Sequence, residues 1–197
     1  MNSKIEAARR QLGTALHLYL NDFDPVSVLC LAGGGCEVIE HYVSKAGGEP
    51  FISLTLETHP DLDAAKLHRT QRRYWNAFKH ALDLKGRERD DQKLLADFED
   101  TQNDHMLFIG WYDYAQAVNK MPIEAQVHQA WYLALYPEKL DPVFSKEQFE
   151  SLFPNLKNLT RAKQKLRLKN AIRRARANKK IMRDPRTEQR ALILGWP

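Results

Sequence analysis

The chain has 197 residues, 43% of them hydrophobic, which suits one domain with a real core or one domain with an extension. Its charged N-terminal segment lacks the apolar run of a secretion signal, and no apolar stretch approaches the roughly 20 residues needed to cross a bilayer. Two cysteines make no disulfide framework, so we expect a reducing, cytoplasmic location without membrane association.

The net charge of +5 is distributed unevenly along the chain. Residues 157–190 hold fourteen Lys and Arg against two acids, Asp184 and Glu188, a net of +12, so the remainder carries 5 − 12 = −7. A basic segment of this kind is typical of a region that binds nucleic acid or an acidic partner. It is equally typical of a solvated or dimer-packing helix.

Helical periodicity begins at once. Apolar side chains fall on one helical face from residue 3 to residue 20 and predict an amphipathic helix there. Asp24 is suited to cap a second helix, and Pro25 to occupy its first position.

The segment that follows contains Gly33, Gly34 and Gly35 and has two interpretations. It is either one continuous helix whose glycines let a neighbouring backbone approach closely, or a strand, a glycine loop and a helix that bind a nucleotide phosphate. The spacing of the dinucleotide fingerprint and the lysine of the P-loop are both absent. Each glycine costs a helix about 1 kcal/mol, so the first interpretation requires a packing reason.

Residues 45–60 contain two glycines and two prolines and are expected to form a loop, extended around residues 51–56. Asp61 and Asp63 favour the N-terminus of the next helix, which we expect to run to about Leu84.

Residues 91–119 are helical again, and we expect Asn103 and Asp104 to cap the start of that helix. Pro122 opens a further helix, in which apolar residues recur every four positions. Beyond it, Ser145 and Gln148 have the spacing of a capping box. The basic segment then has only a thin apolar face, made of Leu159, Ala162, Leu166 and Ile172.

These patterns predict an all-α protein. We expect an antiparallel bundle of about five helices over residues 1–140, then a linker and a basic helical extension over residues 141–197. Cys30 and Cys36 match no zinc-site spacing and are expected to be small core residues. We expect neither a metal nor a cofactor.

The helix at residues 67–83 carries two kinds of side chain on two faces. Its buried stripe is Leu67, Tyr74, Phe78 and Leu82, and its polar row is Arg69, Arg73, Asn76 and His80, flanked by Arg72 and Lys79. A histidine titrates near neutral pH and can exchange a proton with the 2′-hydroxyl of RNA or with the leaving oxygen, while an arginine clamps the phosphate. We therefore predict Arg73, Asn76 and His80 as catalytic, with Arg69, Arg72 and Lys79 binding RNA.

This part of the chain resembles the HEPN superfamily, small all-α bundles whose ribonuclease members carry an arginine and a histidine with four to six residues between them. Arg73 is followed by six residues and His80, and Asn76 by three. The run from Asn76 to Ala81, after a first helix and a glycine-bearing second one, is similar to a group of bacterial HEPN-like proteins. The resemblance covers residues 1–140 and departs from the pattern at Trp75, where the family has arginine.

The resemblance implies a metal-independent ribonuclease that acts as a homodimer, in a defence or stress system. Two apposed copies of the polar row would form one basic cleft. The alternative is a non-catalytic helical protein that binds RNA, DNA or a protein partner through its basic helix. The predicted contacts of that helix are Arg167, Lys169, Arg173, Arg174 and Arg176. A nucleotide-binding α/β enzyme that uses the three glycines is a third hypothesis.

Overall fold

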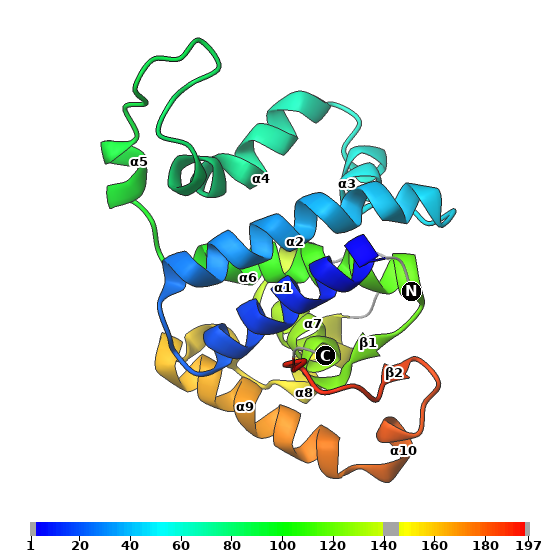
Figure 1. Cartoon of the computed structure of the whole chain (residues 1–197). Helices are drawn as coiled ribbons and strands as arrows, with labels where there is room; N and C mark the ends of the chain where they lie inside the picture. Colours follow the sequence, from blue (N-terminus) through cyan, green and yellow to red (C-terminus); the bar gives the residue numbers. More distant parts are fainter. Residues whose placement is uncertain (1–2, 140–145, 196–197) are drawn as a thin grey trace. The chain divides into compact units, whose positions relative to one another are not determined.

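The computed structural model describes residues 3–139 and 146–195, and it divides the chain into two compact units, Met1–Ala117 and Val118–Pro197. The described residues form ten α-helices and a single pair of two-residue strands, which confirms the all-α prediction (Figure 1). Each unit is described by itself below.

The first two helices pack together along their length in the N-terminal unit. They are α1 (Ser3–Leu20), as the periodicity predicts, and α2 (Pro25–Lys45). Asp24 caps α2 by accepting hydrogen bonds from the backbone N–H groups of Val26 and Ser27. The hydroxyl of Ser27 also donates to this carboxylate and is the main reason that the pKa of Asp24 is lowered.

The three glycines lie inside α2, so the interpretation as one continuous helix is confirmed, and no glycine loop is present there. A Cβ atom at Gly33 would lie 2.5 Å from the ring of Trp75, and one at Gly35 would lie 2.8 Å from Leu12. The glycines therefore hold open the space that neighbouring side chains fill, which is the packing reason that the sequence requires.

By length and composition alone, α2 meets the requirement for crossing a membrane, which corrects the expectation that no stretch does. Its most apolar side chains face the core of the N-terminal unit: Val28, Leu29, Ile39 and Val43 are almost completely buried. A buried core helix meets the same requirement, because packing against protein needs the same apolar side chains as contact with lipid.

The segment expected to be a loop contains an eight-residue helix, α3 (Phe51–Thr58), so that prediction is wrong. The backbone N–H of Phe51, at the start of α3, donates to the Oδ1 atom of Asp113 at 2.7 Å. A carboxylate at this position satisfies a donor that the helix itself leaves unpaired. The hydroxyls of Thr55 and Thr58 bond back to carbonyls of the preceding turn. A contact from a distant helix thus favours α3 over the extended conformation.

The helix that carries the polar row is α4 (Ala64–Lys79), which Asp63 caps by accepting the N–H of Lys66. It ends five residues earlier than predicted. The chain then turns back on its way to α5 (Figure 1). A bridge between Leu82 and Glu88 makes this turn a short hairpin.

Asp83 stabilises this hairpin and thereby ends the helix. Its carboxylate accepts the N–H groups of Lys85 and Arg87 and pairs with the guanidinium of Arg87, and Gly86 has the positive φ that the turn needs. Leu82, predicted to be in the buried stripe, is 55% exposed as a result.

A short helix, α5 (Gln92–Ala96), and the long α6 (Thr101–Val118) complete the N-terminal unit. Asn103 and Asp104 are fully buried inside α6 and do not cap it, which corrects the prediction. Asp104 accepts the hydroxyl of Tyr19 at 2.5 Å, and Asn103 donates to the carbonyl of Pro25. Both side chains therefore connect α6 to the first helical pair.

The C-terminal unit contains β1 (Met121–Pro122), α7 (Ile123–Leu135), α8 (Lys146–Leu152), α9 (Arg161–Ala177), α10 (Lys179–Met182) and β2 (Thr187–Glu188), with 3-10 turns at Pro137–Lys139 and Leu156–Asn158. The two strands pair in parallel. The sequence placed α7 with the N-terminal bundle, whereas here it packs against α8 and α9. The proposed boundary at residue 140 and the capping residue Ser145 lie outside the described residues.

The basic helix α9 packs on α7 through Leu168 and Ile172, both of which are buried. The indole N–H of Trp131 on α7 donates to the carbonyl of Gln164. Leu166, predicted to be on the apolar face, is 54% exposed on the opposite side. The basic segment is thus an integral helix of its unit with a different buried face from the one predicted.

Candidate nucleic-acid interface

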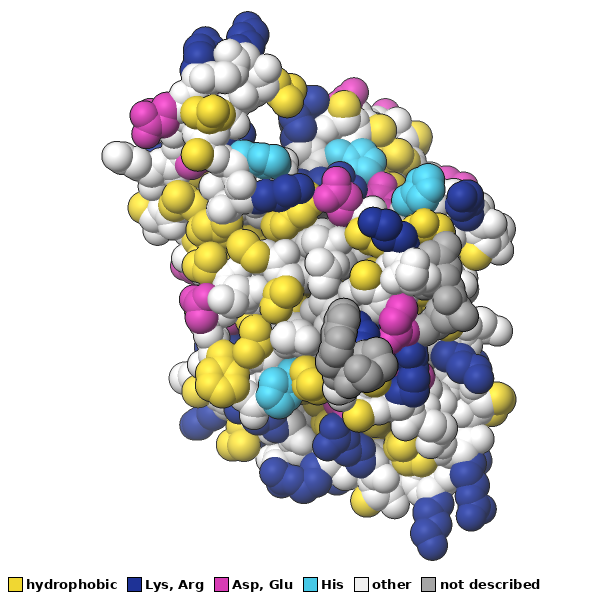
Figure 2. Space-filling model, viewed as in Figure 1, with side chains coloured by type: hydrophobic (Ala, Val, Ile, Leu, Met, Phe, Trp, Pro, Cys, Tyr) yellow, Lys and Arg dark blue, Asp and Glu magenta, His cyan; other side chains and the backbone are white. Residues whose placement is uncertain are grey.

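The two units differ strongly in charge. Met1–Ala117 contains 13 Lys and Arg against 18 Asp and Glu, a net of −5, and Val118–Pro197 contains 17 against 7, a net of +10. Lys and Arg side chains gather on the surface over α9 and α10 (Figure 2). Several cations of the first unit also lie within 4.0 Å of a carboxylate: Arg10, Arg69, Arg72, Lys79, Arg87 and Arg89.

An exposed row of cations lies on α9, opposite the buried Leu168 and Ile172. At 100° per residue, Lys163, Arg167 and Arg174 fall within about 40° of one another around the helix axis. Arg173 lies on the flank of the row and donates to the Oδ1 atom of Asn170 at 3.1 Å. In the described part of the chain, none of these four cations is paired with a carboxylate.

The row is electrostatically unfavourable within α9 itself. Like charges four residues apart, as at Lys163 and Arg167, destabilise a helix by about 0.2–0.5 kcal/mol per pair. Lys163 also lies in the first turn, which contains no acid and where the helix dipole disfavours a cation. Arg174, in the last turn, is favoured by the helix dipole. Helix stability therefore does not account for Lys163 and Arg167, whereas contact with an external anion would.

Three more exposed cations, Lys179, Lys180 and Arg183, continue the basic surface beyond α9. They lie on and beside α10, which Asn178 caps by accepting the N–H groups of Lys180 and Ile181.

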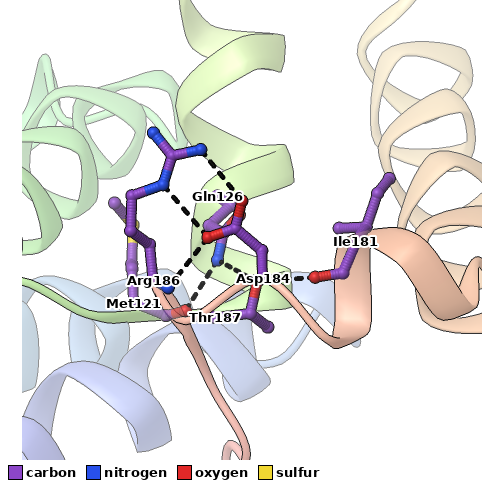
Figure 3. Close-up of polar contacts among 6 residues, drawn as sticks. All are labelled: Met121, Gln126, Ile181, Asp184, Arg186 and Thr187. Carbon is purple, nitrogen blue, oxygen red and sulfur yellow. Dashed lines mark hydrogen bonds and ion pairs between the residues drawn. The ribbon is translucent and has the colours of Figure 1, made fainter.

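A cluster of polar contacts holds this end of the unit in place (Figure 3). The hydroxyl of Thr187 donates to the carbonyl of Ile181, and the side-chain amide of Gln126 reaches both Thr187 and the carbonyl of Met121. Arg186 pairs with Asp184 and lowers the pKa of that carboxyl to about 2. The contacts fix α10 and its cations to the start of α7.

Two of the residues on α9 that were predicted to contact a nucleic acid are not on its exposed, unpaired surface. Arg176 is paired with the buried carboxylate of Glu124 on α7, and Lys169 is half-buried. Arg167, Arg173 and Arg174 are exposed as predicted. Lys163, Lys179, Lys180 and Arg183 were not singled out from the sequence, because the orientation of α9 depends on which leucine is buried.

The flanking cations of α4 are engaged within the N-terminal unit. Arg72 is 2.7 Å from the carboxylate of Glu40, Lys79 is 3.6 Å from that of Glu37, and Arg69 is 3.9 Å from that of Asp63. The pairs of Lys79 and of Arg69 are largely exposed to solvent, so they contribute little to stability. Each pair still lowers the positive charge that the α4 surface offers a phosphate.

The predicted catalytic residues are only partly brought together. Arg73 is exposed, its guanidinium lies 4.6 Å from the ring centre of Tyr74, and within the described residues it has no carboxylate partner. Asn76 is half-buried on the same helix, and its backbone carbonyl accepts the backbone N–H of His80. His80 follows the last residue of α4 in extended conformation, so it does not continue the helical row. The prediction that His80 lies on the helix is wrong, because the Asp83 hairpin begins there.

Trp75 has a structural role. Its ring is buried against Gly33, and the ammonium of Lys79 lies 4.1 Å from the ring centre. The departure from the HEPN pattern at this position thus serves the contact between α4 and α2.

A groove of about 640 Å³ lies in the N-terminal unit between α2, α3 and α4. Glu40, His41 and Arg72 line it, and His68 approaches Glu40 to 3.6 Å. The charged groups of the groove neutralise one another, and the described residues contain no cluster of three metal-ligating side chains. No pattern in the sequence pointed to this groove, since its residues come from three separate segments.

Asp113, near this groove, is 1% exposed. Burial raises its pKa to about 7, the N–H of Phe51 opposes the rise, and the nearby charge of Glu40 adds to it. Burial also raises the pKa of the Cys36 thiol, whose Sγ atom donates to the carbonyl of Met106. Cys36 is therefore an unreactive core residue, as predicted.

No protein-family model, no curated protein and no solved structure matches this chain. The resemblance to HEPN domains accordingly depends on the residues of α4 and of the helices before it.

Proposed function

We propose that this protein binds nucleic acid through the basic surface of its C-terminal unit. The observation that carries the proposal is the row formed by Lys163, Arg167 and Arg174, three exposed cations on one face of α9 without carboxylate partners among the described residues. A nucleic acid is the polyanion whose charges are spaced closely enough to engage several of them together.

The surface is suited to contacts with the phosphate backbone. Arginine binds phosphate through two parallel hydrogen bonds, and the cations of α9 and α10 supply most of the charge. No aromatic residue occurs between Arg161 and Met182, so stacking on bases contributes nothing there. Phosphate contacts of this kind position a protein on the nucleic acid and make its affinity strongly dependent on salt.

The test compares two variants with equal charge loss. Replacing Lys163, Arg167 and Arg174 by Gln is expected to weaken binding to a 20-base-pair DNA duplex and to reduce the slope of log K against log salt by about 2.7, or about 0.9 for each lost phosphate contact. The measurement is fluorescence anisotropy between 50 and 300 mM KCl.

The control replaces Lys66, Lys85 and Lys93, exposed cations of the N-terminal unit, by Gln. It changes the net charge by the same amount and should leave both the affinity and the slope near those of the wild type. Equal losses in the two variants would mean that only net charge matters, and would overturn the assignment to α9.

A second candidate, which we also propose for testing, is metal-independent cleavage of RNA by a homodimer through Arg73 and His80. It is favoured by the exposure of both side chains and by the absence of a carboxylate partner for Arg73 among the described residues. Two copies of α4 side by side would bring two Arg73 and two His80 side chains to one shared cleft.

This activity predicts RNA cleavage in EDTA that falls at least tenfold in His80→Ala and in Arg73→Ala, within the range that general acid–base catalysis contributes. His59→Ala is the matched control, because His59 is an exposed histidine outside the row. Equal cleavage by the wild type and all three variants, or cleavage by none, would exclude the candidate.

A further inference from the structure

The exposed face of α9 has more order than a basic patch requires. Asn170 lies at the middle of the face, with Arg167 three residues before it and Arg173 three residues after. At 100° per residue these two arginines lie about 60° to either side of the asparagine. Lys163 and Arg174 lie closer to the centre line, toward the two ends of the helix. The face therefore has cations on both flanks and at both ends, and an amide in the centre.

Leu166, one turn before Asn170, lies about 40° from it around the helix axis, on the side of Arg173, and is 54% exposed. The carbonyl oxygen of Asn170 accepts a hydrogen bond from Arg173, which orients the amide and leaves its second lone pair and its NH₂ group for a ligand. An exposed leucine and an oriented amide between arginines are unnecessary for binding phosphates alone. They are the side chains that contact thymine methyl groups and adenine edges.

The dimensions of the face limit the kind of nucleic acid. From Lys163 to Arg174 the helix rises about 16 Å, and an α-helix with its side chains is about 10–12 Å across. The major groove of B-form DNA, about 12 Å wide, admits such a helix, and its two strands would then lie beside the two flanks. The major groove of an RNA duplex is deep and too narrow for side chains to read, and single strands are held by stacking aromatics, which α9 lacks.

We propose that the ligand is double-stranded DNA and that α9 lies in its major groove, with Arg167 and Arg173 on opposite strands and Asn170 facing the base edges. The proposal rests on the function proposed above and specifies its substrate. Phosphate contacts by the flanking and terminal cations provide most of the affinity, and Asn170 and Leu166 provide preference among sequences.

The first test uses three 20-mers of the same sequence at 100 mM KCl: a DNA duplex, an RNA duplex and a single DNA strand. We expect the full-length protein to bind the DNA duplex at least tenfold more tightly than either of the others. Equal affinity for all three would overturn this inference and leave nucleic-acid binding intact. Binding to none of them would overturn both proposals.

The second test locates the helix in a groove. Dimethyl sulfate methylates guanine N7 in the major groove and adenine N3 in the minor groove, so one footprint reports on both. We expect the bound protein to protect guanine N7 only. Protection of adenine N3 alone would overturn the placement of α9, even if the duplex is bound tightly.

The third test examines Asn170. In a selection from randomised DNA duplexes, Asn170→Ala should lose at least tenfold enrichment at an adenine that the wild type prefers, while its affinity for an unselected duplex stays within about twofold. Asn158→Ala, at an exposed asparagine of the same unit, should keep the wild-type preference. An unchanged preference in Asn170→Ala would overturn the base contact.

Discussion

Raising the pH from 5 to 8 is expected to destabilise the folded protein by about 3 kcal/mol through Asp113 alone. In the folded state the pKa of this carboxyl is about 7, against 3.8 when it is unperturbed, and burial is the main cause. The folded state therefore binds more protons than the unfolded state between these two values. The contribution of Asp113 to stability is greatest below pH 3.8 and is lost as the pH rises through 7.

Asp113→Asn tests this contribution, because asparagine is neutral at every pH and its carbonyl can still accept the N–H of Phe51. The difference in the free energy of unfolding between wild type and variant, measured by urea denaturation, should shift in favour of the variant as the pH rises from 5 to 8. Asp184→Asn is the control: Arg186 lowers the pKa of Asp184 to about 2, so its contribution changes only below about pH 4. A difference between wild type and Asp113→Asn that is constant from pH 5 to 8 would contradict the prediction.

The consequence of ionising Asp113 is local. Its carboxyl holds the first turn of α3, and α3 forms one wall of the groove beside Glu40. The bond from Phe51 is favoured by the charged carboxylate, whereas burial and Glu40 favour the neutral acid. Because the two effects oppose one another, we expect the start of α3 to respond to pH near neutrality.

The sequence predicts best where local signals and tertiary packing agree. The periodicity of residues 3–20 gives the bounds of α1, and the aspartate–proline pair gives the start of α2. Prediction from the sequence fails where a contact outside the local pattern determines whether a helix forms or where it ends. Without Asp113, nothing in residues 51–58 indicates a helix, and without the hairpin of Asp83 the apolar spacing continues to Leu82.

In the candidate site, too, the sequence shows the local pattern but not what tertiary packing decides. The excess of cations in residues 157–190 is visible in the sequence, but their orientation is not. Burying Leu168 in place of Leu166 rotates the exposed face of α9, exposes Lys163 and turns Arg176 toward Glu124. On α4, the spacing between Arg73 and His80 indicates one helical face only if the helix continues through both residues, and it stops at Lys79.

Adjacent glycines of α2 are expected to respond to alanine with opposite signs. At Gly33 a Cβ atom would lie 2.5 Å from the Trp75 ring, so Gly33→Ala overpacks the contact and should cost about 1–3 kcal/mol. At Gly34 the nearest atom is the Nε2 atom of the Gln11 side chain, 3.1 Å away, which can move aside. Gly34→Ala should therefore gain up to about 1 kcal/mol from helix propensity.

Trp75→Ala is expected to give the largest loss of folding stability. It also tests whether the Trp75 ring is the reason that Gly33→Ala is destabilising. Trp75→Ala should destabilise the protein by about 3–5 kcal/mol, because the ring is 5% exposed and fills the space above Gly33. In that background Gly33→Ala meets no ring, so it should become stabilising, and a double-mutant cycle measured by urea denaturation should give a coupling of about 1–3 kcal/mol. A Gly33→Ala substitution that costs the same with and without Trp75 would mean that the glycine serves the backbone of α2 and not this contact. The cycle thus decides whether the tryptophan that departs from the HEPN pattern is the reason for the glycine beneath it.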